Sequence, residues 1–98
     1  MIRYDETMTR SDMTALLLRI LEQAEERDRR IGEFQQYVWH TRETPLEFNE
    51  EEWGVIVDLA YDLDFYEPNP DWRREDTSYY GEERLIREIH ESLAKLSN

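Results

Sequence analysis

The sequence predicts an all-α protein, a small antiparallel four-helix bundle. Four segments place apolar residues three and four positions apart, as amphipathic helices do, and no segment shows the alternation that is typical of a strand. The chain has 98 residues, which is enough for one domain with one modest core. We therefore expect a single domain over residues 1–98, with residues 1–10 as a loosely ordered N-terminal extension.

The first two helices are predicted over residues 11–25 and 28–43. Ser11 is the expected N-cap of the first, because its hydroxyl can accept a hydrogen bond from a free amide of the first turn. The stretch AEERDRR between the two contains no helix breaker, so both a tight turn and a continuous helix agree with the sequence. Pro45 is expected to end the second helix, because proline lacks an amide hydrogen and disfavours helical backbone at the residue before it.

The third helix is predicted over residues 49–66. Asn49 is its expected N-cap, and Glu52, three residues later, can complete a capping box. The apolar positions cover much of the girth of this helix, which is typical of the most buried helix in a bundle. Pro68 and Pro70 end it.

A long connection over residues 69–80 follows, and unusually long connections often carry function. Gly81 then leads into the fourth helix, predicted over residues 81–96. The apolar residues expected to share one core are Leu17, Ile20, Phe34, Val38, Ile56, Leu59, Leu63, Ile89 and Leu93.

The net charge of −12 is concentrated in one third of the chain. Residues 43–76 contain twelve acidic and two basic residues, a net charge of −10. This argues against nucleic acid or an anionic membrane as a direct partner, since both need cationic patches, and it permits a basic protein. There is no apolar run of about 18 residues that could span a membrane. The charged N-terminus also lacks the apolar centre of a secretory signal, so we expect a cytoplasmic protein.

Acidic and aromatic residues are mixed over residues 58–83. Exposed rings beside charges are typical of binding hot spots. Three other interpretations stay open: the acids could form a solvated face, Tyr61 and Phe65 could belong to the core, and Trp72 could cover a helix end. The candidate binding residues on this stretch are Asp58, Asp62, Asp64, Tyr66, Glu67, Asn69, Asp71, Trp72 and Glu75.

Other site chemistries fit the sequence poorly. Asp64 and Glu75 stand twelve positions apart, counted inclusively, as in a calcium-binding loop, but tyrosine, proline and asparagine replace the oxygen ligands and the glycine that such a loop needs between them. Neither His40 nor His90 belongs to the Glu-x-x-His pattern of a di-iron bundle. The chain has no cysteine, no phosphate-binding glycine loop and no nucleophile elbow. We therefore expect no cofactor, no metal ion and no catalytic activity.

The segment DLDFYEPNPDWRREDTSYYGEERLIREIHESLAKL resembles the C-terminal half of the colicin D immunity family, which includes immunity proteins of related toxin systems. The resemblance covers residues 58–96, and the first half agrees only in the placement of its helices. Three features carry it: the acidic and aromatic helix end at residues 64–68, an acidic loop with aromatic residues at 71–79, and a final amphipathic helix. Asn69 departs from the acid that often follows the proline in the family.

The resemblance implies an inhibitor that binds a toxin domain which cleaves tRNA in the anticodon loop. Its acidic side chains would stand in for RNA phosphates in the basic cleft of the toxin, in a 1:1 complex. Asp64 and Glu67 match the acids that flank the aromatic residue before the proline, and Asp71 would replace the acid that is absent at Asn69. Both bacteriocin and contact-dependent toxin systems agree with this resemblance.

Two other functions remain open. The first is an acidic nucleic-acid mimic directed at another basic protein, with its charges spread at phosphate spacing. The second is a non-catalytic accessory or dimerisation bundle, whose sign would be an exposed apolar face on the first or second helix.

Overall fold

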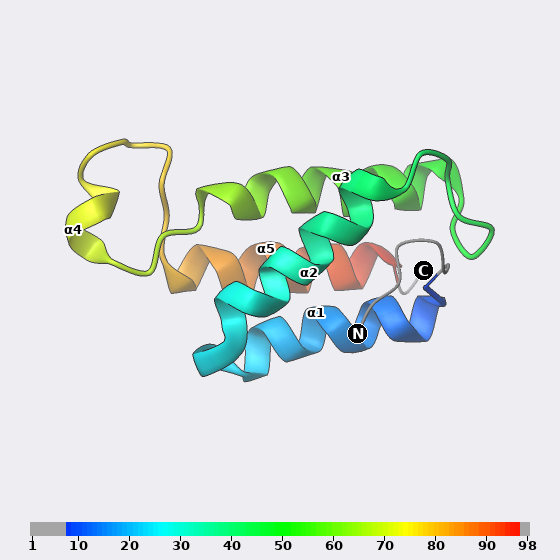
Figure 1. The fold of residues 1–98 in the computed structure, drawn as a ribbon, viewed down its shortest axis with the longest axis horizontal. Coiled ribbons are helices and arrows are strands. Elements are labelled where there is room, and N and C mark those ends of the chain that lie inside the picture. The colour runs from blue at the N-terminus through cyan, green and yellow to red at the C-terminus, as the bar shows by residue number, and fades with distance from the viewer. Residues whose placement is uncertain (1–7, 97–98) are drawn as a thin grey trace.

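The structure, a computed structural model, describes residues 8–96, and this part of the chain is all-helical, as predicted. Figure 1 shows α1 (Arg10–Glu22), α3 (Glu50–Asp62) and α5 (Glu82–Leu96) lying along the long axis of the molecule, with α2 (Arg27–His40) crossing them obliquely. No helix within the described residues is long and apolar enough to cross a membrane. The elements are α1 (Arg10–Glu22), the 3₁₀ turn η1 (Ala24–Glu26), α2 (Arg27–His40), α3 (Glu50–Asp62), the 3₁₀ turn η2 (Leu63–Phe65), α4 (Pro70–Arg73) and α5 (Glu82–Leu96).

The start of α1 differs from the prediction. Its N-cap is Thr9 and not Ser11, because Thr9 can form a complete capping box with Asp12. The Asp12 amide donates to Thr9 Oγ1 at 3.0 Å, and the Thr9 amide donates to Asp12 Oδ2 at 3.1 Å. Of the expected N-terminal extension, residues 1–7 lie outside the described residues, Met8 packs against the core, and Thr9 and Arg10 are the N-cap and the first residue of α1.

A tight turn at Gln23 separates α1 from α2, which decides between the two possibilities that the sequence left open. The buried side chain of Arg27 closes this turn. Its Nε donates to the carbonyl of Ile20 at 2.7 Å, and its Nη2 donates to the carbonyl of Leu21 at 2.9 Å. These are carbonyls of the last turn of α1, which have no partner within the helix. A third contact joins Arg27 Nη1 to Glu82 of α5 at 3.5 Å.

The second helix ends at His40, before the predicted boundary at residue 43, and Pro45 is therefore not the residue that ends it. The Thr41 hydroxyl donates to the carbonyl of Tyr37 at 2.6 Å, which satisfies an orphan group of the last turn. Pro45 lies instead in the following turn, where its carbonyl accepts from the amide of Phe48 at 3.1 Å.

The capping box of α3 is confirmed, and it is also part of a longer-range cluster. The Glu52 amide donates to Asn49 Oδ1 at 2.8 Å, and the Asn49 amide donates to Glu52 Oε1 at 3.0 Å. The guanidinium of Arg10 binds both Glu52 oxygens, at 2.7 and 2.8 Å, and its Nη1 also donates to the Leu96 carbonyl at 2.8 Å. The hydrogen bonds from Arg10 and Asn49 lower the pKa of Glu52 to about 2. One arginine thus joins the starts of α1 and α3 to the end of α5.

The core lies where α1 and α3 pack against both α2 and α5. Eight of the nine predicted core residues are buried, and the ninth, Leu93, is partly buried and packs against the others. The core also contains aromatic rings that were not predicted from the sequence. Trp53 packs edge-on against Tyr37, with ring centroids 6.2 Å apart, and lies 6.0 Å from Phe48. The core positions α3 so that its other side, and the chain that follows it, face solvent.

Candidate protein-binding surface

The connection between α3 and α5 forms a projection, which we call the lobe and define as residues 67–79. Figure 1 shows it extending past the ends of the long helices, with α4 at its tip. Backbone hydrogen bonds join its two ends: the Tyr80 amide donates to the Phe65 carbonyl at 3.0 Å, and the Glu67 amide donates to the Tyr80 carbonyl at 2.9 Å. This makes an isolated parallel bridge between Tyr66 and Tyr80. The chain therefore leaves the helices and returns to them at one closed base.

The side chain of Tyr80 fastens that base to the end of α3. Tyr80 is buried, and its hydroxyl lies 2.8 Å from Asp62 Oδ2 and 2.9 Å from the Asp62 carbonyl. Arg84 of α5 lies over the Tyr80 ring, 4.6 Å from its centroid, and its Nη2 is 3.3 Å from Asp62 Oδ1. Burial, together with the hydrogen bond to Asp62, raises the pKa of Tyr80, so the hydroxyl stays protonated as a donor at neutral pH. Asp62, a predicted binding residue, thus already has two partners within the chain.

Polar side chains also hold the first turn of the lobe. Asn69 is the N-cap of α4, and its Oδ1 accepts from the Asp71 amide at 2.9 Å. The backbone amide of Asn69 in turn donates to Glu67 Oε1 at 3.1 Å. Glu67 is half-buried. Of the predicted binding residues, Asn69 and Glu67 therefore shape the backbone of the lobe, while the second carboxylate oxygen of Glu67 has no hydrogen bond within the described residues.

The tip of the lobe presents side chains that are open to a partner. Asp71, Trp72 and Glu75 are all exposed, and 58% of the Trp72 surface is accessible. Asp71 lies 3.7 Å from Arg74, with 77% and 81% of these side chains accessible. An ion pair this exposed contributes little to stability, so either residue can turn to a partner at small cost. With more than half of its surface accessible, Trp72 is not buried over a helix end.

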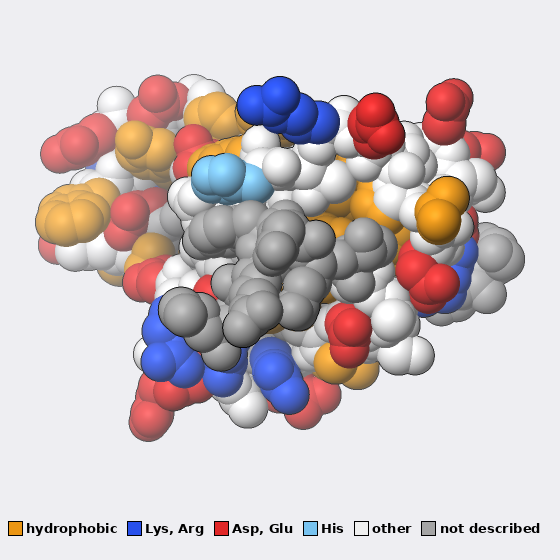
Figure 2. Space-filling view, turned by 45° about the vertical axis from the view of Figure 1, so that its right-hand side comes forward, with side chains coloured by type: hydrophobic (Ala, Val, Ile, Leu, Met, Phe, Trp, Pro, Cys, Tyr) orange, Lys and Arg blue, Asp and Glu red, His pale blue; other side chains and the backbone are white. Residues whose placement is uncertain are grey.

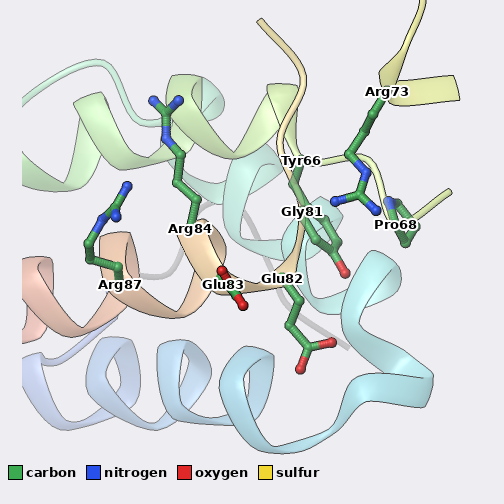
Figure 3. A pocket seen from close by; sticks show the side chains of 8 residues that line it. All are labelled: Tyr66, Pro68, Arg73, Gly81, Glu82, Glu83, Arg84 and Arg87. Carbon is green, nitrogen blue, oxygen red and sulfur yellow. The ribbon is translucent and has the colours of Figure 1, made fainter. Parts of the chain in front are cut away.

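A hollow of about 520 Å³ lies on the inner side of the lobe. Figure 3 shows the Arg73 side chain reaching from α4 toward Gly81. A Cβ at position 81 would collide with the Arg73 guanidinium, so the glycine lets the arginine lie against the backbone there. Both arginine and glutamate side chains line the hollow, and it therefore does not favour a ligand of one charge.

The outward side of α3 and the turn η2 that follows it carry a second group of exposed rings. Tyr61 is 60% exposed and Phe65 is 43% exposed, so neither belongs to the core. Trp39 of α2 lies beside Tyr61, with ring centroids 6.1 Å apart. Trp39 was not among the candidate residues, and its position beside Val38 does not mark it as exposed, because Tyr37 also adjoins Val38 and is buried.

The structure divides the predicted binding residues among three places. Asp58 and Asp62 line a small hollow between α3 and α5. Asp64 lies on the α2 side of α3, with Oδ1 3.5 Å from Gln35 Nε2. The remaining residues belong to the lobe or its base. Within residues 8–96, no group of three or more acidic or histidine side chains is arranged to hold a metal ion. Figure 2 shows hydrophobic side chains lying among acidic ones at the end of the molecule that carries α4.

Comparison of the chain with protein-family models, with curated proteins and with solved structures gives no match. What this surface can bind therefore follows from its own charges, rings and hydrogen bonds.

Proposed function

We propose that this protein is an immunity protein that binds a basic, tRNA-cleaving toxin domain and blocks its active site. The exposed acids and rings of the lobe would contact the cleft of the toxin, in a 1:1 complex. The protein would act by binding alone, without catalysis or a cofactor, and in the cytoplasm, where tRNA is found. We also propose that the fold is an antiparallel four-helix bundle, in which α2 crosses the other three long helices obliquely.

The observation that carries this proposal is the lobe, which is both closed at its base and charged at its tip. Asp71, Trp72 and Glu75 are exposed there, while the Tyr66–Tyr80 bridge and the Asp62–Tyr80 hydrogen bond hold the ends of the connection. A surface that is ordered before binding loses little conformational entropy in the complex, so more of its contact energy appears as affinity. A connection that served only to join two helices would need neither this anchoring nor an exposed tryptophan.

Electrostatics supplies the mechanism of inhibition. A nuclease that binds tRNA needs a cationic cleft for the phosphates. Carboxylates can occupy that cleft in place of phosphates, and arginine binds them with two parallel charge-assisted hydrogen bonds. The net charge of −12 attracts such a cleft at long range and speeds association. Bound protein and tRNA then exclude each other directly.

The structure suggests different roles for the predicted binding residues. Asp71, Trp72 and Glu75 have exposed side chains, so we assign them direct contacts with the toxin. Glu67 is half-buried at the base of the lobe, where its free carboxylate oxygen would make a more desolvated contact. Asp62 is assigned a positioning role, because Tyr80 and Arg84 already bind its carboxylate.

Charge reversal in the lobe tests this assignment. We expect Asp71→Lys and Glu67→Lys each to weaken binding to the toxin domain by about 2 kcal/mol or more, because each would put a cation against a cationic cleft. Most of the loss should appear as faster dissociation. Glu91→Lys makes the same charge change at an exposed position on α5 and should alter only the salt-dependent association rate. Binding is measured at two salt concentrations, and growth is followed during co-expression with the toxin domain.

The partner for this experiment is expected in the neighbouring reading frame, directly upstream, as a basic nuclease domain. Full protection by the Asp71→Lys, Glu67→Lys double variant would refute the proposal, and the acids of the lobe would then be a solvated face.

A further inference from the structure

The closed base of the lobe does not by itself fix the direction in which its tip points. The two backbone hydrogen bonds there both involve Tyr80, one with Phe65 and one with Glu67, so they hold the lobe at one place only. Figure 1 shows α4 standing apart from the long helices. A segment with few packed contacts moves readily, and the lobe could turn about its base like a flap on a hinge. A further contact, away from the base, would stop this rotation.

Arg73 is the residue of α4 that makes such a contact. The other three residues of α4 are exposed, whereas Arg73 is half-buried. Its guanidinium lies against Gly81, the residue that directly precedes α5 (Figure 3). Within residues 8–96 this guanidinium forms no ion pair and no hydrogen bond, so the contact is one of packing. It therefore depends on the space beside Gly81.

The glycine supplies that space. Glycine is often required where φ is positive, but no glycine among the described residues has a positive φ, so the backbone at Gly81 does not require one. The three heavy atoms nearest to a Cβ built at position 81 all belong to the Arg73 guanidinium. Because these atoms end a flexible side chain, an alanine at this position would displace the arginine and leave the fold intact.

We infer that Arg73 is a positioning residue, whose packing against Gly81 fixes the orientation of the lobe relative to α5. Asp71, Trp72 and Glu75 are then presented to a partner in one arrangement, and less conformational entropy is lost on binding. The effect on binding rests on the proposed function, because the partner is the toxin domain. The orientation itself can be measured on the free protein.

Distances between two spin labels measure this orientation. The chain contains no cysteine, so Thr77→Cys and Glu91→Cys place one label in the lobe and one on α5, both at exposed positions. We expect a narrow distribution of label-to-label distances in the labelled protein and a broader one after Arg73→Ala. Arg74→Ala is the matched control, because it removes the same charge from an adjacent side chain that is 81% exposed, and it should leave the distribution unchanged. No broadening after Arg73→Ala, or equal broadening from both variants, would overturn the inference.

A double-mutant cycle tests whether the space beside the glycine is the cause. Gly81→Ala should broaden or shift the distance distribution when Arg73 is present, because the new Cβ displaces the guanidinium. In the Arg73→Ala background the same change should have little further effect, since the atoms that the Cβ would meet are gone. Equal effects in both backgrounds would contradict the inference, because Gly81 would then act through its own backbone.

Binding to the toxin domain gives a second readout. Arg73→Ala should bind about fivefold more weakly than Arg74→Ala, which carries the same net charge, because an unheld tip must be ordered in the complex. The two variants should have the same Tm, which separates positioning from stability. If the unchanged protein does not bind the toxin while the label distances respond as expected, the proposed function fails and the positioning role stands. If it binds and both arginine variants bind equally well with unchanged distances, the positioning role fails and the proposed function stands.

Discussion

Replacing Tyr80 by phenylalanine tests whether one hydroxyl anchors the lobe. The change keeps the buried ring and removes only the donor to Asp62, at 2.8 Å from Oδ2 and 2.9 Å from the carbonyl. A hydrogen bond to a charged group contributes about 1.5–3 kcal/mol to stability. The Asp62 side chain is 26% exposed and keeps its contact with Arg84, so water and the guanidinium can replace part of the lost bond. We therefore expect the free energy of unfolding to fall by about 1–2 kcal/mol.

Urea denaturation at pH 7, followed by circular dichroism, measures this change. In a domain of this size the same loss lowers Tm by about 5–15 °C. Tyr66→Phe is the matched control, because the Tyr66 ring lies beside that of Tyr80, with centroids 6.3 Å apart, but its hydroxyl makes no hydrogen bond within the described residues. It should change stability by less than about 0.5 kcal/mol. A loss of under about 0.5 kcal/mol for Tyr80→Phe, or an equal loss for both variants, would refute the anchoring role.

Three further predictions concern the core, the acid range and metal ions. Leu59→Ala should destabilise the protein by about 2–5 kcal/mol in the same urea assay, since Leu59 is 3% exposed; a loss under about half a kcal/mol would mean that α3 is not central. The pKa of Glu52 is lowered from 4.5 to about 2 in the folded protein, mainly by its hydrogen bond to Arg10, so this pairing stabilises the fold above pH 4.5 and its contribution is lost as the pH falls toward 2. Unfolding measured across this range should therefore depend less steeply on pH for Glu52→Gln than for the wild type, and parallel curves would contradict the assignment. Calcium or a chelator should leave Tm unchanged, whereas a clear rise with calcium would restore the loop from Asp64 to Glu75 as a binding site.

Features set by neighbouring residues could be predicted from the sequence. The Asn49–Glu52 capping box is an example, because both members lie within one helical turn. The same pattern was present at Thr9 and Asp12, and the prediction of Ser11 missed it by considering the cap residue without its partner three positions later. Such errors are local, and the sequence contains the information that corrects them.

Features set by distant residues could not be predicted in this way. Asp62 is separated from its partners Tyr80 and Arg84 by 18 and 22 residues, and nothing in the sequence distinguishes it from Asp58. The same holds for Trp39, whose exposure depends on where α3 packs against α2. Tyr37 and Trp39 both adjoin Val38 in the sequence, yet Tyr37 is 1% exposed and Trp39 is 44% exposed.

The sequence by itself determined the helical class, most of the core and the concentration of negative charge, because helical periodicity and composition are properties of the chain at short range. The tertiary structure decided which of those charges a partner can reach. Glu52 became an internal link because packing brought Arg10 from α1 to it, and Asp62 became an anchor for the lobe because the returning chain brought Tyr80 to it. Asp71 stayed exposed because the closed base of the lobe carries α4 away from the other helices (Figure 1). The sequence shows where the carboxylates are in the chain, but whether a partner can bind one of them depends on which cations and donors the fold places beside it.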